Sequence, residues 1–176
     1  MGCEEEALTL RSAFSTPSAV VVSGIEKKRL FVANAKEETL QVINLDQDLK
    51  KAEFVQAKAF FPLRVPVGPG PVELAASKLT NLVVVLNPLL GTIRLFDAET
   101  LTWVDSTGAE LQLPEGSMAN AIQLSPRPCD LPCQETFFVS LLGASAIARV
   151  DLLDNHTLQI ERLYALPFAP VAMAAS

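Results

Sequence analysis

Side chains able to carry out nucleophilic or acid–base chemistry are scarce in this sequence. The single imidazole, His156, lies in an Asp-Asn-His-Thr stretch typical of a surface turn, and no Gly-x-Ser-x-Gly nucleophile motif is present. The Gly-Pro-Gly-Pro stretch at 68–71 lacks the lysine and the backbone N–H donors that hold a phosphate group. The sequence therefore predicts neither a nucleophilic triad nor a phosphate-binding loop.

Acidic and amide side chains are the remaining candidates for a catalytic or metal-binding role. Asp46 and Asp48 are one residue apart, but the Leu-Lys-Lys that follows lacks the glycine and glutamate of a calcium loop. We interpret this pair as a solvated turn. Asn34 and Asn87 end corresponding apolar segments and are expected to face the same side of the fold. These residues alone predict no catalytic residue, no metal ligand and no cofactor site.

Two of the three cysteines, Cys129 and Cys133, lie within the segment 126–135. A structural zinc needs about four ligands, and the only histidine belongs to another turn, so we predict a local disulfide in an exported protein. This segment is the longest insertion and contains three prolines, so it has little conformational entropy to lose on binding. We predict a protein-contact loop there; the alternative is a structural excursion without a partner. The expected contact residues are Arg127, Asp130 and Leu131.

The third cysteine, Cys3, follows a glycine near the start of the chain. Gly2-Cys3 resembles the end of a bacterial lipoprotein processing site, which predicts lipidation of Cys3, although no hydrophobic signal segment precedes it. A second interpretation is myristoylation at Gly2 with palmitoylation at Cys3, but Glu6 stands where that motif has Ser or Thr. A third interpretation is the ordinary N-terminus of a cytosolic protein, in which the cysteine is incidental. The lipoprotein interpretation predicts a periplasmic or cell-surface protein held at the membrane by a lipid.

Composition limits the class of protein further. The 176 residues are 49% hydrophobic and 19% charged, which is enough apolar material for a folded core. The apolar stretch at 82–90 is interrupted by Asn87 and Pro88 and is too short to span a membrane. The net charge of -6, from 14 basic and 20 acidic residues, repels a phosphate backbone. We therefore exclude a transmembrane helix and expect no nucleic-acid partner.

A short phrase occurs four times along the chain. It reads PSAVVVS from Pro17, PVELAAS from Pro71, ANAIQLS from Ala119 and PVAMAAS from Pro170, so the starts lie 54, 48 and 51 residues apart. A period near 50 residues accommodates one four-stranded sheet per unit and exceeds the 33 or 34 residues of common helical repeats. The repeat is therefore a unit of architecture.

Each unit divides into apolar segments separated by Gly, Pro, Asn and Asp. Segments such as RLFVAN, NLVVVLN and TFFVSL are rich in Val, Leu and Phe without strict alternation, which predicts strands covered on both faces. Strands are expected at 18–23, 29–34, 40–46 and 52–57, at 72–77, 81–87, 92–97 and 102–105, and at 121–125, 136–141, 146–151 and 158–163.

The units resemble the YVTN-type β-propeller repeat of surface-layer and periplasmic proteins. The pattern, a Pro-x-x-hydrophobic-x-x-Ser phrase, a strand ending in Asn, a turn, and a strand ending in Asp, is matched at Pro71–Leu101 and less closely at Pro17–Asp46. The third unit inserts Pro126–Cys133 and has Ser140 where the others have Asn34 and Asn87. The resemblance implies an all-β fold, a β-propeller of four-stranded blades.

On this interpretation residues 1–15 form a tether or leading strand, and residues 16–176 form the propeller repeats. The sequence supplies about three complete blades and the start of another. An incomplete ring leaves open strand edges, so self-association is expected. The predicted blades cover residues 16–69, 70–116 and 117–168, and 169–176 begin the next.

The predicted function is a non-catalytic propeller scaffold, exported and envelope-associated, that mediates protein–protein contact. One alternative is a lactonase-like or hydrolytic propeller enzyme whose acidic, metal-dependent channel site is completed by further blades. Another is a cytosolic interaction module. The repeat itself specifies a fold much more closely than an activity.

Overall fold

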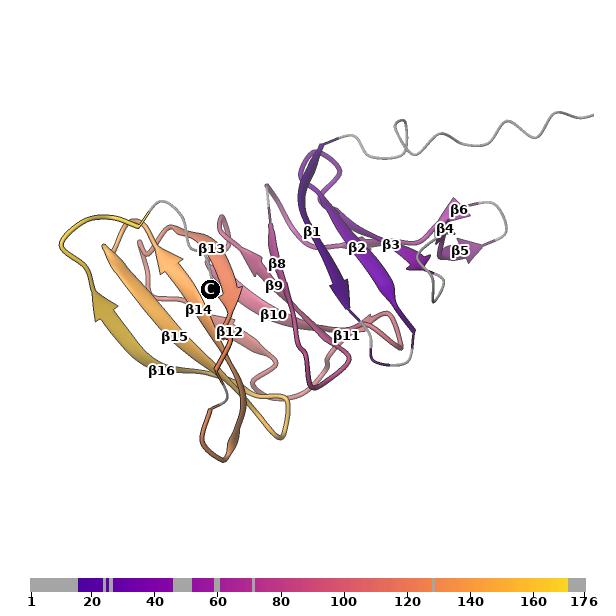
Figure 1. Ribbon diagram of the computed structural model, residues 1–176. Helices are drawn as coiled ribbons and strands as arrows, with labels where there is room; N and C mark the ends of the chain where they lie inside the picture. The colour runs from indigo at the N-terminus through magenta and orange to yellow at the C-terminus, as the bar shows by residue number, and fades with distance from the viewer. Residues whose placement is uncertain are drawn as a thin grey trace, which may run out of the picture.

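The computed structural model describes residues 16–23, 25, 27–45, 52–58, 61–70, 72–127 and 129–170. These residues form sixteen β-strands and no helix, so the all-β prediction is confirmed for this part of the chain. Sequence-adjacent strands pair antiparallel and build three main sheets and one small hairpin (Figure 1). The hairpin consists of β5 (Gln56–Lys58) and β6 (Phe61–Pro62).

The three main sheets, named sheet 1, sheet 2 and sheet 3 in chain order, share one topology. Four strands follow one another across each sheet, and in sheets 1 and 2 an additional short strand pairs with the third. Sheet 1 contains β1 (Pro17–Ser23), β2 (Arg29–Asn34), β3 (Thr39–Leu45), β4 (Ala52–Phe54) and β7 (Arg64–Pro66). Sheet 2 contains β8 (Glu73–Ala76), β9 (Leu82–Asn87), β10 (Thr92–Asp97), β11 (Thr102–Trp103) and β12 (Glu110–Gln112). Sheet 3 contains β13 (Ala119–Leu124), β14 (Cys133–Leu141), β15 (Ala146–Leu153) and β16 (Leu158–Ala165).

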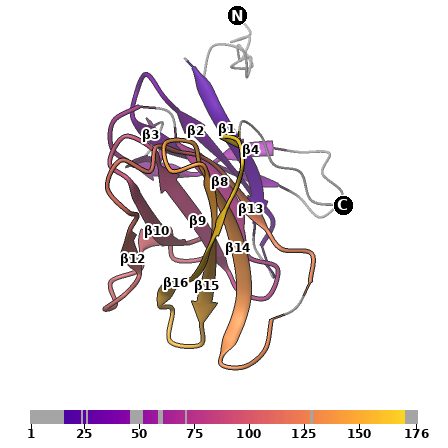
Figure 2. The ribbon, with the colours of Figure 1, turned by 90° about the vertical axis from the view of Figure 1, so that its left-hand side faces the viewer.

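The first strands of the three sheets lie beside one another. β8 contacts β1 on one side and β13 on the other, and the turned view shows the three strands in succession (Figure 2). The repeated phrase therefore forms the equivalent strand in each sheet, because PSAVVVS is β1, PVELAAS contains β8 and ANAIQLS contains β13. The sheets stack face to face along this row.

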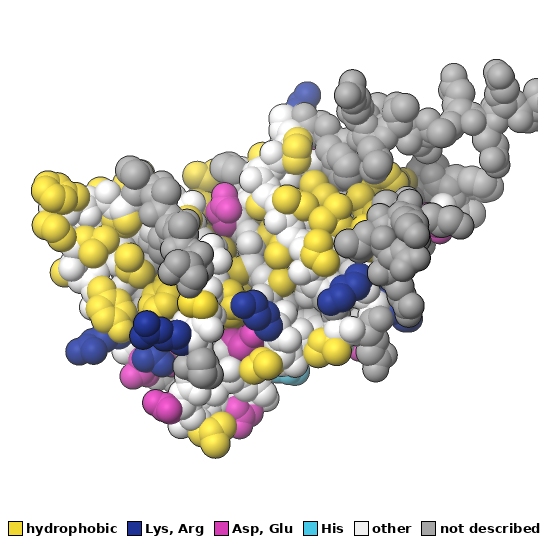
Figure 3. All heavy atoms as spheres, in the orientation of Figure 1, with side chains coloured by type: hydrophobic (Ala, Val, Ile, Leu, Met, Phe, Trp, Pro, Cys, Tyr) yellow, Lys and Arg dark blue, Asp and Glu magenta, His cyan; other side chains and the backbone are white. Residues whose placement is uncertain are grey.

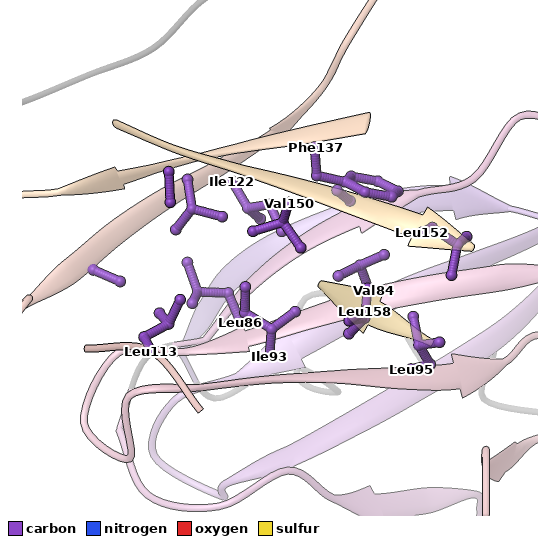
Figure 4. Close-up of a cluster of buried hydrophobic side chains, with 14 of the residues drawn as sticks. Val84, Leu86, Ile93, Leu95, Leu113, Ile122, Phe137, Val150, Leu152 and Leu158 are labelled. Carbon is purple, nitrogen blue, oxygen red and sulfur yellow. The ribbon is translucent and has the colours of Figure 1, made fainter. Parts of the chain in front are cut away.

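Two apolar clusters hold the stack together. Between sheets 1 and 2, the fully buried Phe96 meets Phe31 and Trp103 edge to face, with ring centroids 6.1 and 5.3 Å away. Between sheets 2 and 3, side chains from both sheets interdigitate (Figure 4). Every residue of β9 is buried, because one of its faces packs on each neighbouring sheet. This explains why its sequence shows no polar alternation.

A buried arginine adds a polar link between sheets 1 and 2. The Arg29 guanidinium donates to the carbonyl oxygens of Ala98 and Glu99 in the turn after β10, and to Asn44 Oδ1 in its own sheet. Its exposed fraction is 8%. Because Nε and Nη1 both have acceptors, the buried charge at the sheet junction is held by three hydrogen bonds.

The strand register corrects one detail of the repeat alignment. Asn34 pairs with Thr39 and Asn87 with Thr92, and the equivalent pair in sheet 3 is Leu141 with Ala146. The alignment of Ser140 with the two asparagines is therefore wrong by one residue. The same pairing places Asn44 at the position of Asp97 and Asp151, whereas Asp46 and Asp48 lie outside the described residues.

Removing the Phe96 ring is expected to destabilise the fold strongly. Phe96→Ala deletes the side chain that touches both Phe31 and Trp103, and a buried Phe→Ala change costs about 3–5 kcal/mol. Urea unfolding followed by circular dichroism measures the loss. Leu89→Ala, at a position 68% exposed, is the matched control and is expected to change stability by less than about 0.5 kcal/mol. Equal effects of the two changes would contradict the burial of Phe96.

A second prediction concerns Glu73, whose pKa is raised by burial. A carboxyl group whose pKa is higher in the folded than in the unfolded state favours folding below its unfolded pKa, and that contribution is lost as pH rises through the folded pKa. Glu73→Gln is therefore expected to raise the urea midpoint at pH 7 and to leave it nearly unchanged at pH 3. Glu115→Gln, at an exposed position, serves as control. An equal gain at both pH values would show that burial of the charge is not the cause.

Candidate functional site

The candidate site is the loop between β13 and β14. A disulfide joins Cys129 and Cys133, with sulfur atoms 2.10 Å apart and Cα atoms 5.8 Å apart, as the spacing predicted. Cys133 is buried at the start of β14, so the bridge ties the loop to the sheet. The backbone N–H of Cys133 also donates to the carbonyl oxygen of Asp130. The bridge and the hydrogen bond together close a tight turn on the sheet edge.

The predicted contact residues of this loop point to solvent. Leu131 is 88% exposed, and Arg127 and Asp130 are also exposed. The Arg127 backbone N–H donates to Ser125 Oγ, which holds the start of the loop to the end of β13. Pro128 lies outside the described residues. The loop thus presents an exposed leucine, with one negative and one positive exposed side chain in the residues before it.

A hollow of about 230 Å³ separates the loop from the neighbouring sheet. It is lined from sheet 3 and its loop by Ser125, Pro126, Arg127, Gln134, Glu135 and Thr136, and from the turn after β8 by Lys78 and Leu79. The lining carries both signs of charge around an apolar floor. Such a surface suits a peptide segment with an apolar residue and polar neighbours better than it suits a single anion or cation.

Glu135 fixes the two sides of this hollow to each other. Its Oε1 atom accepts a 2.7 Å hydrogen bond from the backbone N–H of Lys78, so a sheet 3 side chain caps the chain leaving β8. The Glu135 side chain is buried. The turn after β8 is held further by Ser77 Oγ, which accepts hydrogen bonds from the N–H groups of Leu79 and Thr80. The rim of the hollow is therefore anchored on both sheets.

The sequence also singled out Asn34, Asn87 and His156, and none of them lines this hollow. Asn87 donates through Nδ2 to the Val67 carbonyl oxygen and accepts through Oδ1 from the N–H groups of Leu89 and Leu90. Asn34 occupies the equivalent buried position in sheet 1, but its Nδ2 and Oδ1 atoms have no hydrogen-bond partner among the described residues. His156 is exposed in the β15–β16 turn with φ 59°, as the surface-turn interpretation expected. Cys3 lies outside the described residues.

Asp151 has the most highly organised carboxylate among the described residues, but on another surface. It accepts from Arg149 Nε and Nη2, both at 2.9 Å, and from Thr136 Oγ1 at 2.7 Å. The hydrogen bonds to Asp151 raise the pKa of the Arg149 guanidinium above its ordinary value. Asp97, at the equivalent position of sheet 2, accepts through Oδ1 from the backbone N–H groups of Glu99 and Thr100 in the turn after β10. The Asp151 carboxylate instead holds an arginine on the sheet face.

Within the described residues, no group of three or more His, Cys, Asp and Glu side chains is placed to hold a metal ion. The same residues contain no helix of the length and apolarity that crossing a bilayer requires.

Sequence reasoning missed the contribution of Lys78, Leu79 and Glu135 to the hollow. A signal for it was present in the repeated phrase. Ser77 and Ser125 occupy the last position of the phrase in neighbouring sheets, so the residues that follow them leave adjacent strands at the same edge. The loop at 126–135 therefore lies next to the turn that begins at Lys78.

Comparison with known proteins identifies the fold but no family. No family model matches the chain, and no curated protein matches its sequence. Among solved structures, the fold is similar to that of a functionally unknown protein from Desulfotomaculum acetoxidans DSM 771, with a TM-score of 0.60 at 15% identity. The match covers 88% of this chain but 44% of the other, so this chain spans less than half of that protein. The chain is thus an all-β protein of stacked antiparallel sheets that shares its fold with part of a longer chain.

Removing the disulfide is expected to cost modest stability because it closes a short loop. In the chain-entropy model, a bridge between residues four apart stabilises by about 2 kcal/mol. The double variant Cys129→Ser/Cys133→Ser should lose no more than this in urea unfolding. Treating the wild type with a reductant provides the matched comparison. A loss of more than about 4 kcal/mol would show that the loop supports the core as well as the surface.

Proposed function

We propose that this protein is a non-catalytic β-propeller module that binds another protein through the loop 126–135. The propeller assignment is supported by three antiparallel sheets, each with four strands in succession, that stack face to face with their first strands adjacent, as in neighbouring blades. The YVTN-type resemblance of the repeats supports the same arrangement. Loops on such a rigid scaffold are common sites of recognition.

The observation that carries the binding role is the exposure of Leu131 on a covalently closed loop. An exposed leucine is ordinary on a flexible segment, but here the disulfide and the Cys133–Asp130 hydrogen bond hold it in a closed loop. The two ends of that loop line the hollow. A pre-organised loop loses little conformational entropy on binding. Burying one leucine side chain contributes about 1.5–3 kcal/mol.

Charged residues of the loop then set the orientation of the partner. Asp130 directly precedes the leucine and Arg127 lies four residues before it, while Lys78 lines the hollow from sheet 2. Exposed charges of this kind affect association rate and specificity more than affinity. The partner surface is accordingly a segment with one apolar residue placed between groups of opposite charge.

The proposed location is the periplasm or the cell surface, with a lipid on Cys3 as the means of attachment. A surface disulfide persists in an oxidising compartment and is reduced in the cytosol, so the Cys129–Cys133 bridge supports export.

The binding role is tested by photo-crosslinking followed by affinity measurement. A photoreactive residue at position 131 is expected to capture a protein that the same residue at position 89 does not capture. Leu89 is the matched control because it is also an exposed leucine, on the turn after β9. With the captured protein purified, Leu131→Asp should weaken binding about tenfold or more, equivalent to about 1.4 kcal/mol, and Leu89→Asp should not. Equal affinity of the two variants would refute the proposed site.

A further inference from the structure

The turns that follow the first strands of the three sheets repeat one combination of side chains. Each turn begins after the serine that ends the repeated phrase, and each carries a cation and a large apolar residue on the surface. Ile25, Leu79 and Leu131 are 57%, 63% and 88% exposed. The cations of the same turns are exposed as well, and they are Lys27, Lys28, Lys78 and Arg127.

Hydrogen bonds between neighbouring turns join them into one surface, which we call the turn rim. The Ile25 backbone N–H donates to Asn81 Oδ1 at 2.7 Å, so the β1–β2 turn is tied to the β8–β9 turn. The Lys78 backbone N–H donates to Glu135 Oε1, also at 2.7 Å, so the β8–β9 turn is tied to sheet 3. The turns lie along the lower side of the stack in Figure 1, and Figure 3 shows Lys and Arg side chains among hydrophobic ones on that side.

A second hollow lies between the first two turns of the rim. Its volume is about 420 Å³, larger than that of the hollow beside the loop 126–135, which we now call the first hollow. Its lining combines the apolar side chains of Val22 and Ile25 with the ammonium groups of Lys28 and Lys78. Lys78 also lines the first hollow, so the two hollows adjoin at this residue.

The second hollow is complementary to an acidic group. Among the described residues its lining contains two lysines and no acidic side chain, although the chain has a net charge of -6. The neighbouring Glu99 carboxylate accepts from Asn81 Nδ2 at 3.1 Å and does not line the hollow. Ser23 is 4% exposed, and its hydroxyl has no hydrogen-bond partner among the described residues. The lining therefore offers positive charge and one unpaired hydroxyl donor.

The chemistry of the rim favours a peptide carboxylate over a phosphate group. A phosphate is commonly held by several free backbone N–H groups. In the β8–β9 turn the N–H group of Lys78 is bound to Glu135, and those of Leu79 and Thr80 are bound to Ser77 Oγ. The turn thus offers lysine charge without a backbone cradle, and the exposed Leu79 adds an apolar contact that a phosphate cannot use.

We propose that the turn rim binds an extended acidic segment of the partner protein. Its carboxylate occupies the second hollow between Lys28 and Lys78, and its apolar residue occupies the first hollow against Leu79. Each hollow lies between consecutive sheets, which pack about 10 Å apart, and an extended chain spans this distance in about three residues. The inference rests on the binding role proposed for the loop 126–135, and it adds the charge and the path of the bound segment.

Peptide selection tests the predicted chemistry of this segment. A display library of random short peptides is panned on the full 176-residue chain after depletion on the Lys28→Glu/Lys78→Glu double variant. The selected peptides are expected to be rich in Asp and Glu, with an apolar residue about three positions from an acidic one. Recovery of no peptide, or of basic or wholly apolar peptides, would overturn the proposal.

Charge reversal measures the contribution of the second hollow with a selected peptide as the probe. Lys28→Glu and Lys78→Glu should each weaken binding about tenfold or more, because attraction of the carboxylate becomes repulsion. Lys36→Glu is the matched control, since Lys36 is also an exposed lysine, in the β2–β3 turn, and its reversal changes the net charge equally. It should weaken binding less than about twofold. Equal losses in all three variants would reveal an effect of net charge alone and overturn the proposal.

Charge exchange tests whether the two opposite charges meet. A peptide whose acidic residue is replaced by lysine should not bind the wild type and should bind the Lys28→Glu/Lys78→Glu double variant. A lack of recovery overturns the proposal. Vesicles of phosphatidylserine and phosphatidylcholine test a different anionic partner. Vesicle binding that requires Lys28, with no peptide selected, would assign the hollow to a membrane surface and overturn the proposal as well.

The loop function and this inference can fail separately. The partner captured through position 131 is measured with both sets of variants. Normal affinity of Lys28→Glu together with weakened affinity of Leu131→Asp leaves the loop function standing and removes the second hollow from the site. Weakened affinity of Lys28→Glu together with normal affinity of Leu131→Asp has the reverse meaning.

Discussion

Burial of both faces of sheet 2 is the constraint on which the rest of the structure depends. One face packs on sheet 1 around Phe31 and Phe96, and the other packs on sheet 3 around Val84 and Phe137. A main sheet taken out of the stack would expose these apolar faces to water, which costs about 25 cal/mol for each Å² of apolar surface. Stacking therefore stabilises every sheet, and each position in a repeat unit is defined by which neighbour covers it.

This dependence also explains where the candidate binding loop lies. Because β8 and β13 are neighbours, the chain segments that leave them meet at one edge of the stack. Glu135 accepts from the Lys78 backbone there, and the disulfide closes the remaining chain into a compact projection. The site is thus assembled by stacking as much as by its own sequence, since one rim belongs to sheet 2 and the other to sheet 3.

The sequence was sufficient for the all-β class and for most of the strands. Val, Leu and Phe segments separated by turn residues coincide with β2, β9 and β10, because strand-forming residues and full burial act in the same direction there. The Cys129–Cys133 bridge was predictable because its partners are local. The short strands β6, β7 and β12 were not predicted, because they carry too few residues to show a period. Ser140 was misaligned because the third unit lacks the asparagine that marks the end of the strand, and hydrogen-bond register alone places Leu141 there. The rim at Lys78 depends on a hydrogen bond between residues 57 positions apart, for which the repeated phrase carried the only signal.

The Arg149–Asp151 pair has a consequence for the exposed end of the stack. Arg149 occupies the position at which sheets 1 and 2 have Val42 and Leu95, and both of those residues are buried against the sheet that follows. A charged side chain that is paired within its own sheet keeps this face compatible with water, where another apolar residue would enlarge an exposed hydrophobic patch.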